Sequence, residues 1–158
     1  MTTFNGPTPE LGQQLYDTDT KVFNDIQATP GQEAFVFVTS APYEGAGVLT
    51  GLFTATRLLR KGFVVTIVLS EAGVLLAAGT RGYPTVGQEA FPGHMLANKQ
   101  LAALIAEGAT VYADRFALGA LYGAREDDLI PGVTGCNPLD VLDAQLQCLQ
   151  IGAFRLDV

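Results

Sequence analysis

The stretch GATVYADRFALGALYGAREDDLIPGV, residues 108–133, decides the fold of this chain. Gly108 is suited to end a preceding helix, and the run Thr110–Ala113 after it predicts a short buried strand. The small-residue segment Phe116–Gly123 predicts a helix, and Leu129–Val133 predicts a second short strand. The turn Asp114–Arg115–Phe116 therefore lies at the carboxyl end of a strand, where open α/β sheets place their ligands.

The residues upstream predict a strand–helix–strand unit. AFVFVT (Ala34–Thr39) and FVVTIVL (Phe63–Leu69) are continuous runs of the kind found in strands buried on both faces. Between them, apolar positions recur at helical spacing, and basic residues precede Gly62 at the expected helix end. The helical positions are Leu49, Leu52, Phe53, Thr56 and Leu59. These connection lengths favour a right-handed βαβ unit with parallel strands.

Three more segments continue the chain to the opening stretch. Ser70–Ala78 predicts a short apolar helix or turn, and Leu96–Glu107 predicts a helix. Between them, Gly79–Gly93 is rich in Gly and Pro and too long for a simple connection. A loop of this kind is typical of a binding loop or an oligomer contact.

The C-terminal residues predict a capped helix and a last strand. Asn137 caps the helix, Pro138 fits its first position, and Gly152 ends it. Its apolar seam consists of Leu139, Leu142, Leu146 and Leu149. Ala153–Leu156 predicts a fifth strand.

The alternation of strands and helices predicts the α/β fold class. We expect a single Rossmann-like or flavodoxin-like three-layer domain with a mostly parallel sheet of four to five strands. This domain spans residues 32–158, and residues 1–31 form a polar N-terminal arm that packs on a neighbouring subunit.

Composition excludes several classes of function. Of the 158 residues, 48% are hydrophobic and only 16% are charged, so we expect apolar surface to be hidden in a homo-oligomer. The formal charge of −7 argues against a nucleic-acid partner. No apolar run reaches the roughly 18 residues that cross a bilayer, and the N-terminus lacks the features of a signal peptide. We therefore expect a cytoplasmic protein without a membrane partner.

The glycine pattern does not predict a nucleotide cofactor. Gly45, Gly47 and Gly51 are spaced G-x-G-x-x-x-G, one residue longer than the dinucleotide fingerprint, and Glu44 would repel a pyrophosphate. Close packing of a helix on the sheet explains these glycines better. One histidine and two cysteines, without an H-E-x-x-H motif, also predict no metal site.

Acidic residues follow three of the predicted strands. Glu44, Glu71 and Asp114 would meet at one edge of a parallel sheet, with Arg81 and Arg115 to balance their charge. Such convergence predicts a pocket for a small polar ligand. An internal ion-pair network or a subunit interface is the alternative interpretation.

Two further residues are candidates for catalysis beside Asp114. His94 could act as an acid or base because its reference pKa is near neutrality, or it could serve at a helix start or subunit contact. Cys136 precedes a helix N-terminus, where the dipole lowers a thiol pKa and favours the reactive thiolate. Cys148, in the middle of the last helix, is expected to pack.

The chain resembles DsrE/DsrF-like proteins over residues 30–155. The opening stretch resembles their C-terminal half, and TATRLLRKGFVVTIVL and GVLLAA fit the same family. ATRLLRKGF, RGYPTVGQEAFPG, RFALGALYG and NPLDVLD are most similar to a branch linked to the nitrogen-starvation response and often encoded near a nitrilase gene.

The resemblance implies a Rossmann-like homotrimer or homohexamer without a nucleotide cofactor. In the sulfur-relay members, a cysteine after the strand that corresponds to Thr110–Ala113 carries a persulfide, and this chain has Asp114 there. The first hypothesis is therefore a regulatory protein that binds a small metabolite or a protein partner. Its cleft would contain Glu44, Glu71, Arg81, His94, Asp114 and Arg115. The alternative is an enzyme, either a sulfurtransferase using Cys136 or a hydrolase or lyase using His94.

Overall fold

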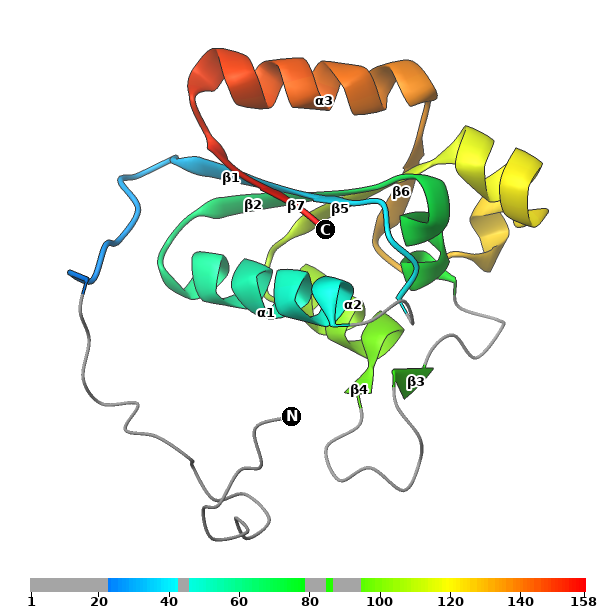
Figure 1. The fold of residues 1–158 in the computed structure, drawn as a ribbon, viewed down its shortest axis with the longest axis horizontal. Coiled ribbons are helices and arrows are strands. Elements are labelled where there is room, and N and C mark those ends of the chain that lie inside the picture. The colour runs from blue at the N-terminus through cyan, green and yellow to red at the C-terminus, as the bar shows by residue number, and fades with distance from the viewer. Residues whose placement is uncertain (1–22, 43–45, 79–84, 87–94) are drawn as a thin grey trace, which may run out of the picture.

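A sheet of five parallel strands forms the centre of the molecule (Figure 1). The computed structural model describes residues 23–42, 46–78, 85–86 and 95–158. The sheet has the order β6-β5-β2-β1-β7. Its strands are β1 (Glu33–Val38), β2 (Val64–Leu69), β5 (Thr110–Asp114), β6 (Val133–Cys136) and β7 (Phe154–Asp157). The predicted α/β class and five-stranded parallel sheet are confirmed.

Helices and short turns connect these strands. The helices are α1 (Gly47–Arg60), α2 (Ala97–Ala106) and α3 (Pro138–Ile151). The turns are the 3-10 segments η1 (Glu71–Ala77) and η3 (Glu126–Asp128) and the π-helical η2 (Ala117–Leu121). A separate two-stranded sheet pairs β3 (Thr85–Val86), within the segment expected to form a long loop, antiparallel with β4 (Met95–Leu96), which follows that segment. The remainder of that loop lies outside the described residues.

The topology distributes the helices unequally over the two faces of the sheet. From β1 through β2 and β5 to β6, each strand lies beside the previous one in the same direction across the sheet. The connection from β6 to β7 runs back the opposite way, so a right-handed crossover places its helix on the other face. Figure 1 accordingly shows α1 and α2 on one face and α3 on the other.

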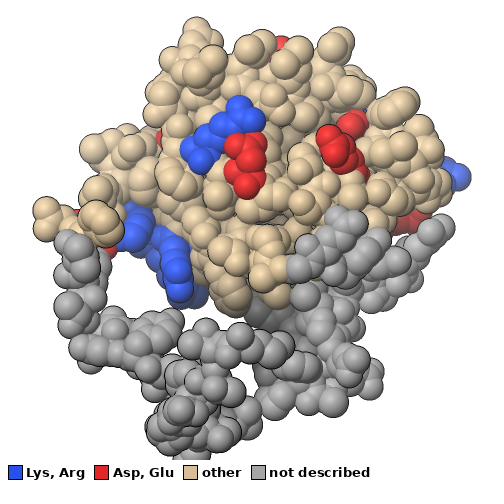
Figure 2. Space-filling view, viewed as in Figure 1, with Lys and Arg blue, Asp and Glu red and all other residues tan. Residues whose placement is uncertain are grey.

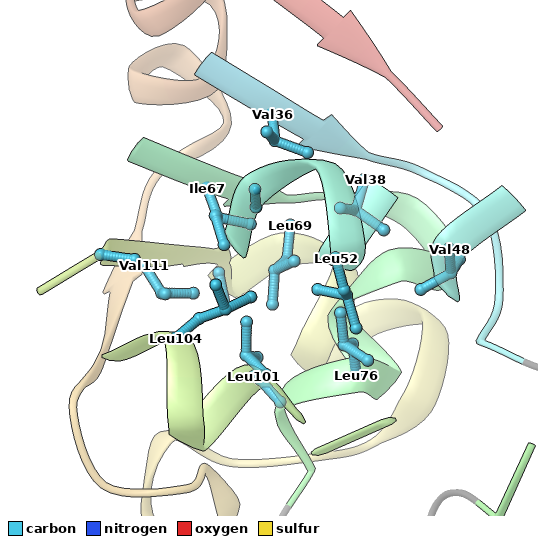
Figure 3. Packing of buried hydrophobic residues seen from close by; sticks show 14 of the residues in the cluster. Val36, Val38, Val48, Leu52, Ile67, Leu69, Leu76, Leu101, Leu104 and Val111 are labelled. Carbon is cyan, nitrogen blue, oxygen red and sulfur yellow. The ribbon is translucent and has the colours of Figure 1, made fainter. Parts of the chain in front are cut away.

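The core lies between the sheet and the layer of α1, α2 and η1 (Figure 3). Alternate residues of β1, β2 and β5 point into it, and Leu52, Leu76, Leu101 and Leu104 meet them from the other layer. These four leucines are at most 1% exposed. On the opposite face, a smaller cluster of Phe35, Phe37, Val68 and Cys148 lies under α3.

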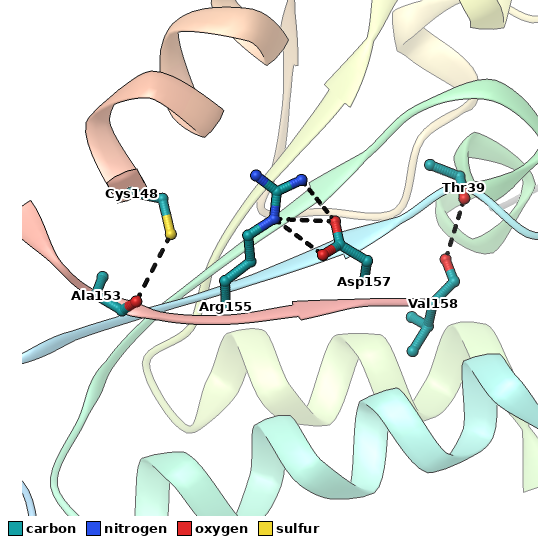
Figure 4. Close-up of polar contacts among 6 residues, drawn as sticks. All are labelled: Thr39, Cys148, Ala153, Arg155, Asp157 and Val158. Atoms are coloured by element: carbon teal, nitrogen blue, oxygen red, sulfur yellow. Dashed lines mark hydrogen bonds and ion pairs between the residues drawn. The ribbon is translucent and has the colours of Figure 1, made fainter. Parts of the chain in front are cut away.

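Strand β7 closes the edge of the sheet beside β1 (Figure 4). The Arg155 guanidinium pairs with Asp157 on the same strand and lies over the Phe37 ring, 4.7 Å from its centroid. The Thr39 backbone N–H donates to the Val158 carbonyl at 2.7 Å. Figure 2 shows that the face of the molecule seen in Figure 1 carries few charged side chains, as the low charged fraction predicts.

The predicted position of β6 along the sequence is wrong. The expected strand at Leu129–Val133 begins only at Val133 and continues to Cys136. Pro131 has no N–H to donate, and Gly132 adopts a φ of 90°, so the chain turns where a strand was predicted. Leu129 instead makes an isolated antiparallel bridge with Ala78. Cys136 is consequently the last residue of a strand.

Two predicted helix faces also differ from the structure. In α1, Val48, Leu52, Ala55 and Leu58 face the core, whereas Phe53 is 45% exposed. In α3, the predicted seam faces solvent, and the helix packs on the sheet through Val141, Ala144 and Cys148. The described part of the N-terminal arm contacts its own chain, because Lys61 pairs with Asp25 and the Ala28 N–H donates to the Lys61 carbonyl.

Gly73 fixes the end of β1 against the turn that follows β2. Its N–H donates to Thr39, and a Cβ at this position would overlap the Val38 carbonyl oxygen and lie 2.6 Å from the carbonyl carbon. Backbone in a central strand cannot move aside. We therefore expect Gly73→Ala to lower the free energy of unfolding by about 3 kcal/mol.

Urea unfolding followed by circular dichroism measures this change. Gly47→Ala in the first turn of α1 is the matched control, because nothing lies within 4 Å of its Cβ position. It should leave stability unchanged or raise it by up to about 1 kcal/mol. Equal stability of the Gly73→Ala protein and the wild type would contradict this packing.

Candidate functional site

The structure brings together three of the predicted site residues at the carboxyl ends of β5 and β6. Asp114 is the register partner of Cys136 on the neighbouring strand, and Arg115 follows Asp114 directly. Glu71 lies just beyond the end of β2, on the other side of β5, with a φ of 50°. Glu44, Arg81 and His94 lie outside the described residues.

Asp114 is buried and has a defined structural role. It is 8% exposed, and its Oδ1 accepts a hydrogen bond from the Phe116 backbone N–H at 2.9 Å. This contact satisfies one of the free N–H groups where the chain leaves β5 and turns into the helical segment. An aspartate is thus well suited to this position, where a cysteine would provide only a weak acceptor.

Arg115 forms an ion pair with Glu126 above β6. The Arg115 Nε donates to Glu126 Oε1, and this bond is the main reason that the pKa of Arg115 is raised and the pKa of Glu126 is lowered. A Cβ at Gly135 would lie 2.7 Å from the Glu126 carboxyl carbon and 3.0 Å from the Arg115 Nε. Glycine at this position lets the ion pair lie directly on the strand.

The Cys136 thiol is protonated at neutral pH. Its pKa is raised to about 11, mainly by burial and further by the Asp114 and Asp140 carboxylates, while Arg115 acts against this shift. The direction is opposite to that expected from the helix dipole alone. Because the thiolate is the nucleophile, this environment makes Cys136 unreactive in the isolated chain. Cys148, on the inner face of α3, is 2% exposed and packs against the sheet, as predicted.

An open groove of about 450 Å³ runs between α3 and the uncovered part of the sheet. Phe35, Val68, Tyr112 and Ala144 give it apolar surface, and Cys136 lies in its lining. Three carboxylates, Glu33, Asp140 and Asp143, also line it, and no Lys or Arg is among the described lining residues. The groove therefore has an acidic rim over an aromatic and aliphatic floor.

Sequence reasoning missed most of this groove. Asp140 is not predicted as a site residue, and its carboxylate accepts a hydrogen bond from the Asn137 N–H at 2.7 Å at the start of α3. Glu33, Tyr112 and Asp143 are not predicted as site residues. One available signal was the alternation in β2 and β5, where Thr66 and Tyr112 interrupt the apolar pattern on a single face of the sheet.

The described residues contain no group of three or more His, Cys, Asp and Glu side chains placed to hold a metal ion. Among the helices that the structure describes, none has the length and apolar character required to span a membrane.

Two solved structures share the fold of this chain. The ychN protein from E. coli matches with a TM-score of 0.60 and 21% identity, over 80% of this chain and 99% of that chain. MTH1491 from Methanobacterium thermoautotrophicum, titled a protein of unknown function, matches with a TM-score of 0.59 and 17% identity, over 80% and 99% of the two chains. At these identities the likeness shows the fold alone, which is a DsrE-like α/β fold. No family model and no curated protein sequence matches the chain.

The environment of Cys136 predicts its response to loss of the neighbouring charge. Asp114→Asn removes a carboxylate that raises the thiol pKa, while the amide oxygen still accepts from the Phe116 N–H. We expect the pKa of Cys136 to fall and its alkylation by iodoacetamide near pH 8 to become roughly three to ten times faster, equivalent to about half to one pKa unit.

Mass spectrometry of the peptide that contains Cys136 measures this rate as a function of pH. The pH profile separates a lower pKa, which shifts the midpoint, from greater exposure, which raises the rate at all pH values. Asp127→Asn is the control, since Asp127 is exposed and is not among the charges that act on Cys136. An unshifted midpoint in Asp114→Asn would show that this carboxylate does not govern the thiol.

Proposed function

We propose that this chain is a DsrE-like oligomer that binds a small ligand and does not carry sulfur. The observation that supports it most directly is Asp114, a buried carboxylate at the carboxyl end of β5 that caps the following turn. By the resemblance, this is the position at which sulfur-relay proteins carry their cysteine. A carboxylate cannot hold a persulfide, and the adjacent Cys136 thiol is kept protonated.

The sulfurtransferase alternative is supported by the DsrE-like fold and by the position of Cys136. The register of β5 and β6 places its thiol beside Asp114, so a persulfide there would occupy the same edge of the sheet. The raised thiol pKa argues against it, because sulfur transfer begins with attack by a thiolate. The hydrolase or lyase alternative depends on His94, which lies outside the described residues.

Incubation with sodium polysulfide separates sulfur carriage from ligand binding. We expect no persulfide on Cys136 of the wild type near neutral pH, since its thiol stays protonated. The Asp114→Cys variant should gain a persulfide at the substituted position, because by the resemblance sulfur-relay proteins carry their cysteine there and the substitution removes a carboxylate from this edge. Mass spectrometry of the intact chain and of its peptides detects the mass of the added sulfur, about 32 Da for one persulfide sulfur per chain. A persulfide on wild-type Cys136 would favour the sulfurtransferase alternative.

The residues that line the groove beside α3 indicate the class of ligand. A cavity with an aromatic and aliphatic floor is typical of small-molecule sites, in which a few charged groups give orientation and specificity. Here those groups are Glu33, Asp140 and Asp143, so the groove favours a small organic amine over an anion. Asp114 and Arg115 lie at the Cys136 end of this groove.

An aliphatic diamine, putrescine, is a suitable probe for this groove. We expect it to raise Tm by about 3–5 °C at tenfold excess over its Kd, whereas succinate should leave Tm unchanged. Asp143→Asn should weaken putrescine binding by about two- to fivefold in titration calorimetry, the effect of losing one exposed charge pair. Asp127→Asn is the matched control. Equal effects of the two substitutions, or binding of succinate alone, would contradict the amine assignment.

The biological setting is proposed from the resemblance. The motifs ATRLLRKGF and NPLDVLD support a cytoplasmic role in the nitrogen-starvation response, as a homotrimer or homohexamer. A protein encoded with a nitrilase is the proposed partner. Co-purification of that nitrilase-cluster protein from nitrogen-starved cells would support this partner.

A further inference from the structure

The outer face of α3 carries four leucines that the described part of the chain leaves in solvent. Their exposed fractions are 73% for Leu139, 50% for Leu142, 52% for Leu146 and 78% for Leu149. The inner face, which packs on the sheet, carries only Val141, Ala144 and Cys148. The larger apolar side chains of this helix therefore point away from its own core, the reverse of an amphipathic surface helix.

The spacing of these residues, which we call the leucine stripe, is that of a seam between two helices. Successive leucines are separated by three, four and three positions, the spacing of a and d residues in a heptad. The stripe covers most of the length of α3, about 15 Å at 1.5 Å per residue. Such spacing places all four side chains on one line along the helix.

We propose that the leucine stripe packs against the same stripe of a second copy, with the two α3 helices antiparallel across a twofold axis. In this arrangement Leu139 meets the partner's Leu149, and Leu142 meets the partner's Leu146. Each stripe is then complementary to itself, as a twofold interface requires.

The charges on α3 favour the antiparallel direction. Its two acidic residues, Asp140 and Asp143, lie in the first half of the helix, and the second half carries the uncharged Gln145, Gln147 and Gln150. A parallel pair would set the aspartates of both copies side by side, whereas an antiparallel pair places them beside glutamines. Opposed helix dipoles favour the same direction.

This inference rests on the proposal that the chain is an oligomer. It adds the surface through which two copies meet, the leucine stripe, and the twofold symmetry of that contact. A trimer needs no twofold axis, but two trimers joined by leucine stripes form a hexamer of closed symmetry. The low charged fraction of the chain, 16%, fits a molecule with a large buried interface.

Light scattering and native mass spectrometry of three variants test the surface. Leu142→Glu with Leu146→Glu should halve the mass of the wild-type assembly, because four charges, two from each chain, enter each seam. Leu142→Met with Leu146→Met should keep the full mass. Phe53→Glu is the control, an exposed apolar residue on α1, and should also keep it. Circular dichroism confirms that each variant is folded, which is expected because all three positions are exposed.

Disulfide cross-linking tests the direction of the two helices. Differently tagged Leu142→Cys and Leu146→Cys chains should form a mixed disulfide dimer after co-purification and mild oxidation, and neither variant alone should cross-link. Self-cross-linking of Leu142→Cys would show a parallel pair and overturn the proposal.

The remaining outcomes also decide the matter. A wild-type chain that is monomeric at high concentration would overturn both the oligomer and the leucine-stripe contact. An oligomer whose mass the glutamate variant leaves unchanged would overturn the leucine-stripe contact alone. Absence of the mixed disulfide would mean that a different segment or protein covers the leucine stripe.

Discussion

A five-stranded parallel sheet must have both faces covered, and in the described part of this chain one face has a single helix for that purpose. Five strands span roughly 24 Å at their usual spacing, whereas a helix with its side chains is about 10–12 Å wide. Most of the structure follows from this mismatch. The face under α1, α2 and η1 carries the main core, and the face under α3 keeps only a small cluster around Phe35 and Phe37. Val64 and Tyr112 consequently remain 50% and 36% exposed, and a groove opens beside the helix.

The same arrangement determines the chemistry at the carboxyl edge of the sheet. Parallel pairing of β5 and β6 brings Asp114 beside Cys136, and the start of α3 adds the Asp140 carboxylate to the same place. Two carboxylates and burial hold the thiol protonated, with one arginine acting against them. A site with this balance favours the binding of a positively charged group and disfavours thiolate chemistry. The local charges therefore support the proposal that this site binds a ligand and does not carry sulfur.

Sequence reasoning succeeded where local pattern and packing agree. The run that became β1 and the residues Ile67–Leu69 of β2 are apolar at nearly every position because both sheet faces are covered there. Gly62 and Gly152 mark helix ends in the left-handed region. It failed where tertiary contacts decide. Apolar Leu129 and Ile130 resemble a strand, but Pro131 and Gly132 form a turn first. In α3 the leucines resemble a core seam. The helix has a second apolar face, formed by Val141, Ala144 and Cys148, and the connections at both helix ends determine which face meets the sheet. The groove could not be predicted because its residues come from four strands and a helix.

Those connections also explain why the leucine stripe does not face the sheet of its own chain. A single residue, Asn137, separates β6 from α3, and two residues, Gly152 and Ala153, separate α3 from β7. The first is held by the Asp140 carboxylate, and the second contains a left-handed glycine whose N–H donates to the Leu149 carbonyl. Rotation of the helix by about 100°, one residue step, would break both ends. It would bring Leu142 and Leu149 to the places of Val141 and Cys148, and it would set the polar Gln145 against the sheet in place of Ala144. The helix is fixed with its small side chains inward, so the leucines cannot be covered by the sheet of their own chain.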